Sequence, residues 1–189
     1  MSAPLTLWRC FPWDAAAPAG EPFSPAYVTT GQTVGRFDLH DAPPVRYLAE
    51  SAVHAVGEAL AEFRGTDFRT SYLIKLRRPL AVVPVVLTAA LLRRIPDCTD
   101  PVVLQALQLR PDQLAHHDRR TTQAIAQRLY REQYAGLSWW SSLTGAWHTT
   151  VFFTDRAARG QVKFGTPEPL TRDHPAVVAA LPILGIRRR

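Results

Sequence analysis

Apolar and polar positions alternate from the first residues of this 189-residue chain. Residues 5–10 place apolar and polar side chains in turn, which predicts an opening β-strand. Four prolines between Pro12 and Pro25 then predict an extended surface loop. The short apolar run from Val45 to Leu48 predicts a second strand.

A helix is predicted directly after this second strand, over residues 52–63. Ser51 precedes it, and a serine hydroxyl can cap the first turn of a helix. Helical spacing gathers four apolar side chains into one stripe: Val53, Val56, Leu60 and Phe63. Glu58 lies on the opposite side of the helix from this stripe, so we expect its carboxylate to face away from the core.

The remaining pattern mixes strands and helices without regular alternation. Strands are predicted at 70–76 and 80–87, parted by a bend at Arg77-Arg78-Pro79, and again at 137–140 and 149–153. Helices are predicted at 87–94, at 102–109 after the start signal Asp100-Pro101, at 121–130 and at 175–181. This mixture predicts an α+β fold rather than a doubly wound sheet.

Length and composition fit one folded domain, residues 1–189. The chain is 47% hydrophobic and 20% charged, which is ordinary for a globular protein and excludes wholesale disorder. The first 18 residues lack a basic start followed by an apolar run, and no stretch is long and apolar enough to cross a bilayer. We therefore expect a cytoplasmic protein.

Neither cysteines nor histidines predict a metal site. Cys10 and Cys98 are too far apart for a CxxC motif, so two buried, reduced thiols are expected. The adjacent side chains of His116 and His117 diverge by roughly 100° on a helix and cannot both face one ion.

The net charge of +6 raises the question of a nucleic-acid partner. The basic residues are scattered, and the dense clusters carry no interleaved aromatics: Arg77-Arg78, Arg93-Arg94, Arg119-Arg120 and Arg187-Arg188-Arg189. A solvated basic surface, or one that meets an acidic protein, is favoured over direct nucleic-acid binding.

The most informative chemistry lies between Val34 and Glu58. Arg36 offers planar donors to phosphate oxygens, Tyr47 offers a ring that can stack on a sugar or base, and Glu58 offers a carboxylate for ribose hydroxyls or a developing positive charge. The chain contains neither GxGxxG nor GxxxxGK[ST]. A nucleotide site would therefore have to be built from side chains.

In order and spacing, these motifs resemble the RES-domain toxins. The resemblance runs through Trp8-Arg9, Gly35-Arg36-Phe37-Asp38, Tyr47-Leu48-Ala49-Glu50-Ser51, Glu58, Gly136 to Ser141 and Val151-Phe152-Phe153. It covers most of the chain, although residues 65–134 match only in general character.

The resemblance implies an ADP-ribosyltransferase-like α+β fold, with mostly antiparallel sheets and short helices around an NAD⁺ cleft. It implies a toxin that cleaves the bond between nicotinamide and ribose, by phosphorolysis or hydrolysis, and so depletes NAD⁺. NAD⁺ would be a substrate rather than a prosthetic group, with inorganic phosphate as the co-substrate of phosphorolysis. The expected partner is an antitoxin with an Xre-like helix-turn-helix domain and a toxin-binding domain that occludes the cleft.

Residue roles follow from the same resemblance. Glu58 would stabilise the oxocarbenium-like transition state. Arg36 and Arg9 would hold the pyrophosphate or an incoming phosphate, and Tyr47 would pack against the nicotinamide ribose or ring. Ser141 would donate to a ribose hydroxyl or the nicotinamide amide, with Ser142 as the alternative serine.

Other interpretations stay open. Arg36 and Asp38 could form a surface ion pair, Glu58 could be a solvated helix charge, and Tyr47 could be a half-buried strand aromatic. Family members often carry arginine where this chain has Ser142, and an acidic residue where it has Ala135, so substrate or acceptor can differ. The alternatives in function are transfer of ADP-ribose to a protein, and a non-enzymatic basic protein that binds nucleic acid.

Overall fold

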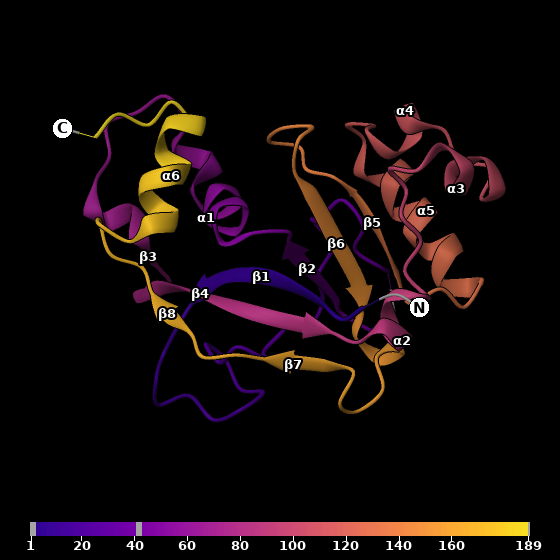
Figure 1. Cartoon of the computed structure of the whole chain (residues 1–189), viewed down its shortest axis with the longest axis horizontal. Helices are drawn as coiled ribbons and strands as arrows, with labels where there is room; N and C mark the ends of the chain where they lie inside the picture. The colour runs from indigo at the N-terminus through magenta and orange to yellow at the C-terminus, as the bar shows by residue number, and fades with distance from the viewer. Residues whose placement is uncertain (1–2, 41–42, 189) are drawn as a thin grey trace. The chain divides into compact units, whose positions relative to one another are not determined.

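The computed structural model describes residues 3–40 and 43–188 (Figure 1). Contacts within the chain gather in two compact units. The first unit contains the described residues of the N-terminal stretch to Leu5, of Val28–Tyr47 and of Val86–Lys163. The second contains Thr6–Tyr27, Leu48–Val85 and Phe164–Arg189, of which Arg189 lies outside the described residues.

The second unit is built on an antiparallel sheet. Its strands are β3 (Ile74–Lys75), β8 (Glu168–Pro169), most of β1 (Leu5–Pro12), most of β4 (Arg78–Leu87) and the last two residues of β2 (Val45–Ala49). They lie in the order β3-β4-β1-β2, and β8 pairs with β4. Trp8 of β1 faces Ala49 of β2 in the register. The predicted strands at 5–10, 45–48 and 80–87 are thus confirmed.

Two helices of the second unit pack on each other, α1 (Ala52–Leu60) and α6 (Pro175–Ile183) (Figure 1). The Ser51 hydroxyl caps α1 by accepting the backbone N–H of His54, as the sequence predicted. The predicted helix is continued by a 3₁₀ turn, Ala61–Phe63. Small residues are among the buried ones in both helices, namely Gly57 of α1 and Ala176 and Ala180 of α6.

The first unit sets helices beside a β-hairpin. Strands β5 (Gly136–Trp140) and β6 (His148–Phe153) pair antiparallel, and the first three residues of β2 belong to this unit as well. The helices are α2 (Ala89–Leu92), α3 (Pro101–Ala106), α4 (Pro111–Leu114) and α5 (Arg119–Arg131). Figure 1 shows α3, α4 and α5 gathered beside β5. The α+β class with antiparallel pairing is confirmed.

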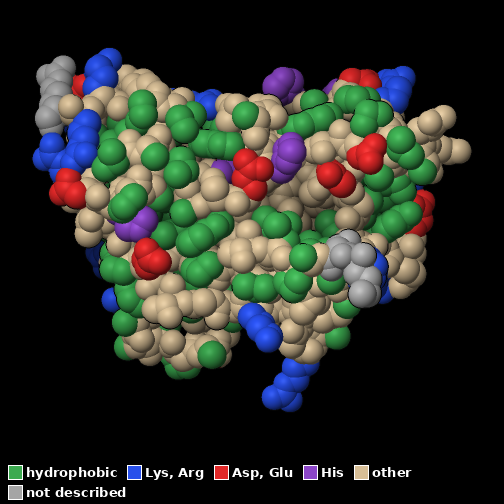
Figure 2. Space-filling model, viewed as in Figure 1, with side chains coloured by type: hydrophobic (Ala, Val, Ile, Leu, Met, Phe, Trp, Pro, Cys, Tyr) green, Lys and Arg blue, Asp and Glu red, His purple; other side chains and the backbone are tan. Residues whose placement is uncertain are grey.

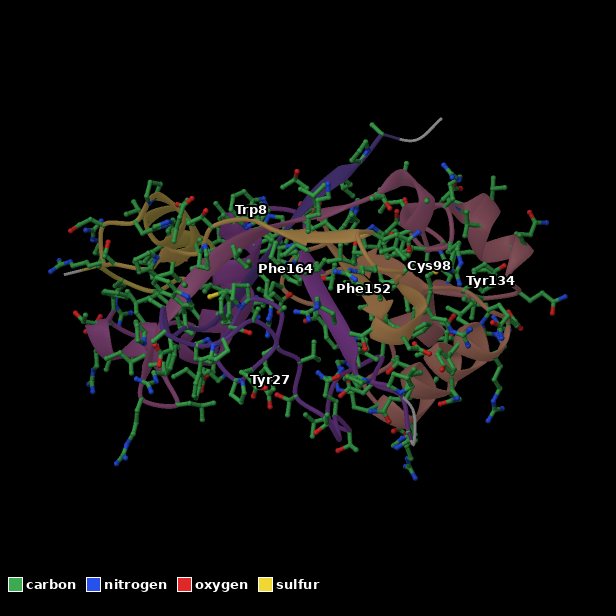
Figure 3. All side chains as sticks on the ribbon, turned by 90° about the horizontal axis from the view of Figure 1, so that it is seen from below. Trp8, Tyr27, Cys98, Tyr134, Phe152 and Phe164 are labelled. Carbon is green, nitrogen blue, oxygen red and sulfur yellow. The ribbon has the colours of Figure 1, made fainter. Side chains whose placement is uncertain are left out.

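Apolar side chains of these helices and strands form one core in the first unit. Leu114 of α4, Leu129 of α5 and Phe153 of β6 are completely buried in it. Cys98 belongs to this core and Tyr134 packs against it (Figure 3).

Both cysteines are free thiols. Burial raises the pKa of Cys10 and of Cys98 to about 12, which keeps them protonated and unreactive at neutral pH.

The predicted strand at 70–76 is wrong. Thr70–Leu73 forms a 3₁₀ turn, and only Ile74–Lys75 is extended. The Tyr72 ring stacks on Phe63, with ring centroids 3.8 Å apart, and this packing overrides local strand propensity. The bend predicted at residues 77–79 lies one residue earlier, because Lys75 pairs with Arg78 and leaves Leu76 and Arg77 as a two-residue hairpin turn.

Short elements complete the described chain. They are the 3₁₀ turn Thr154–Arg156 and the strand β7 (Val162–Phe164), which pairs with β4. Within the described residues, no helix is long and apolar enough to span a membrane.

Candidate functional site

A tight turn at Gly35–Asp38 carries the first candidate residues. The Asp38 carboxylate folds back and accepts the Gly35 N–H at 2.6 Å, and it also accepts the Tyr47 hydroxyl at 2.9 Å. The Tyr47 oxygen in turn accepts the backbone N–H of Phe37. Glycine is needed at position 35, since a Cβ atom would stand 2.4 Å from Asp38 Oδ1 and 2.5 Å from the Tyr47 hydroxyl. The turn is therefore held by hydrogen bonds of the Asp38 and Tyr47 side chains, and we call it the locked turn.

Asp38 is 2% exposed, which excludes the interpretation of a surface ion pair between Asp38 and Arg36. Its buried charge is stabilised by the Gly35 N–H and the Tyr47 O–H. Burial raises the pKa of Tyr47 well above its usual range, and the nearby Asp38 carboxylate raises it further. Tyr47 therefore remains a neutral hydrogen-bond donor over the physiological range.

Replacing Tyr47 with phenylalanine is expected to destabilise the protein by about 2 kcal/mol, because the buried Asp38 carboxylate loses a hydroxyl donor. Urea unfolding should show a lower midpoint with an unchanged slope. Tyr134→Phe is the matched control in the same unit. Among the described residues, no partner is found for the Tyr134 hydroxyl, so this substitution should cost less than about 0.5 kcal/mol. Equal costs for the two variants would contradict the bracing role of Tyr47.

Arg36 stands at the tip of this turn. Its Nη1 donates to the backbone carbonyls of Leu114 at 3.2 Å and His116 at 2.8 Å. Leu114 ends α4, so the guanidinium interacts with the carbonyl end of that helix, where a positive charge is favourable. The turn and α4 thus hold one edge of the guanidinium in place, which is the preorganisation that a phosphate-binding arginine requires.

A cavity of about 470 Å³ lies in the first unit. Its lining residues come from the segments just before and just after the locked turn in the sequence. Its described lining comes from residues 31–33, Leu39, His40, Pro43 and Pro44. The His40 ring contacts the Gln123 side chain, which also donates to the carbonyls of Thr33 and Gly35. This volume lies within the range of small-molecule sites.

Ser141 follows β5 in the first unit and is 7% exposed. Its hydroxyl accepts the N–H of Leu143 at 3.0 Å, and its own N–H donates to the Trp147 carbonyl at 2.7 Å. Ser142, the alternative serine, is exposed. Ser141 therefore shapes the turn between β5 and β6, and the choice between the two serines stays a prediction.

Arg9 lies on β1 in the second unit. Its guanidinium donates to the Pro25 carbonyl and stands 4.9 Å from the centre of the Phe11 ring. Burial lowers the pKa of Arg9 to about 10, so the side chain stays cationic at neutral pH. It ties the proline-rich loop to the strand.

Glu58 lies on α1 in the second unit. Its side chain is 40% exposed, as expected from the helical pattern. Glu58 Oε1 stands 3.3 Å from Nε2 of His54, one turn earlier on the same helix, and the His54 side chain is completely buried. The carboxylate is therefore held on one side by the protein.

The structure brings Arg36 and Tyr47 together through one locked turn, with Ser141 elsewhere in the same unit, and it places Arg9 and Glu58 in the second unit. Sequence reasoning missed two partners. The sequence pattern indicates neither the bond between Asp38 and Tyr47 nor the contact between His54 and Glu58. The i,i+4 spacing of His54 and Glu58 on a predicted helix was an available signal.

The basic clusters are partly neutralised within the protein. Arg78 pairs with Asp14, Arg120 with Asp118, and Arg187 with Asp67. Arg188 pairs with Asp173, and Arg189 lies outside the described residues. On the face that Figure 2 shows, described Lys and Arg side chains gather at the upper left, where acidic side chains also lie. Among the residues placed by the structure, no group of three His, Cys, Asp or Glu side chains could hold a metal ion.

Comparison with known proteins identifies a family and solved structures of similar fold. The structure is similar to a chain from the M. tuberculosis MbcT–MbcA toxin–antitoxin complex, with a TM-score of 0.60. The similarity covers 93% of this chain and 87% of that chain at 18% sequence identity, and it concerns the fold. No match to the curated proteins was found. The RES domain matches residues 6–173, and the chain therefore belongs to the RES domain family.

Proposed function

We propose that this protein binds NAD⁺ and cleaves its nicotinamide–ribose bond, acting in the cytoplasm as the toxin of a toxin–antitoxin system. The RES domain match over residues 6–173 carries this proposal. The locked arginine at position 36 and the partly exposed carboxylate of Glu58 support it, because each suits one part of the chemistry.

In the proposed reaction, the bond between ribose C1′ and the nicotinamide nitrogen breaks, and its electron pair leaves with nicotinamide. Positive charge develops on C1′ and the ring oxygen, and Glu58 stabilises that charge in an ADP-ribosyltransferase-like arrangement. An oxygen of water or phosphate then bonds to C1′, and water releases a proton to solvent. The products are nicotinamide with ADP-ribose, or with ADP-ribose-1-phosphate.

The binding roles follow the chemistry of each side chain. Arg36 and Arg9 would donate to the pyrophosphate or to phosphate. Tyr47 would use its ring against the nicotinamide ribose while its hydroxyl stays bonded to Asp38. Ser141 would hold a ribose hydroxyl or the nicotinamide amide.

The proposed partner is an antitoxin protein with an Xre-like domain that occludes the NAD⁺ site. The likeness in fold to a chain of the MbcT–MbcA toxin–antitoxin complex supports a protein partner of this kind. Direct nucleic-acid binding is not part of the proposal, and internal ion pairs of several arginine clusters agree with that.

The proposed function is tested by incubating the purified protein with NAD⁺, with and without phosphate. We expect nicotinamide release, and mass spectrometry of the second product separates ADP-ribose-1-phosphate from free ADP-ribose. Adding a protein extract would reveal ADP-ribose on a protein acceptor. A folded, partner-free sample that releases no nicotinamide under any of these conditions would overturn the proposal.

A further inference from the structure

We propose that His54 is a positioning residue for the Glu58 carboxylate, an inference that rests on the proposed NAD⁺ cleavage. The two side chains come from consecutive turns of α1, with His54 Nε2 and Glu58 Oε1 3.3 Å apart. The His54 side chain is completely buried, whereas that of Glu58 is 40% exposed. One carboxylate oxygen thus contacts a buried side chain, and the rest of the Glu58 side chain is accessible to solvent.

The second ring nitrogen of His54 fixes which way its proton points. The backbone N–H of Glu50 donates to His54 Nδ1 at 3.4 Å. A nitrogen that accepts a hydrogen bond carries no proton, so the proton of the ring lies on Nε2. That proton is directed at Glu58, and His54 therefore donates to the carboxylate.

The start of α1 holds the ring in this orientation. The Ser51 hydroxyl accepts the backbone N–H of His54, and the His54 ring reaches back to the N–H of Glu50. This exchange resembles a capping box, in which the third helical residue bonds back to the backbone before the helix. With its backbone and one ring nitrogen both bonded, the imidazole has little freedom to swing away from Glu58.

Such an arrangement acts on the rate of the chemical step. A carboxylate whose rotamer is set before substrate arrives loses less entropy at the transition state than a mobile surface carboxylate. A structural role limited to capping the helix would instead need only the bond to Glu50. The two roles use different nitrogens and can be separated by substitution.

The experiment compares His54→Asn with His54→Gln. Asparagine places an amide oxygen near the position of Nδ1, so it can accept the Glu50 N–H but cannot reach Glu58. Glutamine places an amide N–H near the position of Nε2, so it can donate to Glu58 but loses the bond to Glu50. We expect His54→Asn to lower kcat for nicotinamide release about tenfold with little change in KM for NAD⁺. His54→Gln should recover kcat to within about threefold of the parent protein.

The reverse ranking, with an active asparagine variant and an impaired glutamine variant, would assign His54 to helix capping and overturn the proposal. Equal losses in both variants would assign it to packing and overturn it as well. Nitrogen-15 NMR of the histidine-labelled parent protein tests the same point without substitution, because the proposal requires a protonated Nε2 and an unprotonated Nδ1. A proton on Nδ1 would overturn it.

The Glu58→Gln variant, assayed in parallel, keeps the two proposals distinguishable. If it is inactive while His54→Asn is fully active, only the positioning role fails. If Glu58→Gln retains parental nicotinamide release, the assignment of Glu58 fails and the role of His54 falls with it.

Discussion

Replacing Glu58 with glutamine is expected to slow nicotinamide release by about a hundredfold or more. Glutamine has the shape of glutamate but no negative charge, so it cannot stabilise the positive charge that develops on the ribose. Its amide oxygen can still accept from His54, and the side chain is partly exposed, so the fold should be retained. Steady-state release of nicotinamide, measured beside a circular dichroism spectrum and a thermal unfolding curve, checks both parts.

Glu62→Gln is the matched control for this experiment. Glu62 is an exposed carboxylate in the 3₁₀ turn that follows α1. Its substitution removes the same charge from the same region of the chain. We expect parental activity from it. A similar loss in both variants would mean that the net charge of this region matters rather than Glu58 itself.

Replacing Gly136 with alanine is expected to destabilise the protein by about 3 kcal/mol or more. A Cβ atom at this position would lie 1.9 Å from the Val151 carbonyl oxygen and 2.7 Å from the Phe152 Cα atom. Both are backbone atoms of β6, the strand that pairs with β5, so no side-chain rotation can relieve the clash. Thermal or urea unfolding measures the loss.

Gly145→Ala provides the comparison within the same hairpin. Gly145 lies between β5 and β6, and a Cβ atom there meets nothing within 4 Å. Its cost should stay within about 0.5 kcal/mol. If both glycines tolerated alanine equally, the close approach of β5 and β6 at Gly136 would be wrong.

The pattern of the sequence predicted the elements whose ends carry local signals. The Ser51 cap began α1, Asp100-Pro101 began α3, and alternation marked β1. The hairpin turn at Leu76 and Arg77 carries no such signal. Both residues have positive φ, 52° and 62°, a conformation that glycine or asparagine usually adopts in such turns.

Packing between separate elements explains why the strand predicted at residues 70–76 was wrong. Residues 70–73 have strand propensity, but Tyr72 stacks on Phe63 and Leu73 is buried, which a 3₁₀ turn allows. No local pattern encodes a contact between residues nine positions apart in different elements.

The candidate residues were predictable in type, but their bonding was not. The burial of Asp38 depends on the Tyr47 hydroxyl, and the position of Arg36 depends on the end of α4, far along the chain. His54 is completely buried, but the sequence pattern does not indicate this, because histidine is a polar residue outside the apolar stripe of α1.

The connection from β2 to α1 is two residues long. Only Glu50 and Ser51 separate the end of the strand from the start of the helix, and both take part in holding that start. One inserted residue here would turn the helix by roughly 100° relative to the strand. Glu58 would then point in another direction relative to β2. This segment should therefore accept substitutions more readily than insertions or deletions, since the direction of the carboxylate is encoded in the number of residues before it.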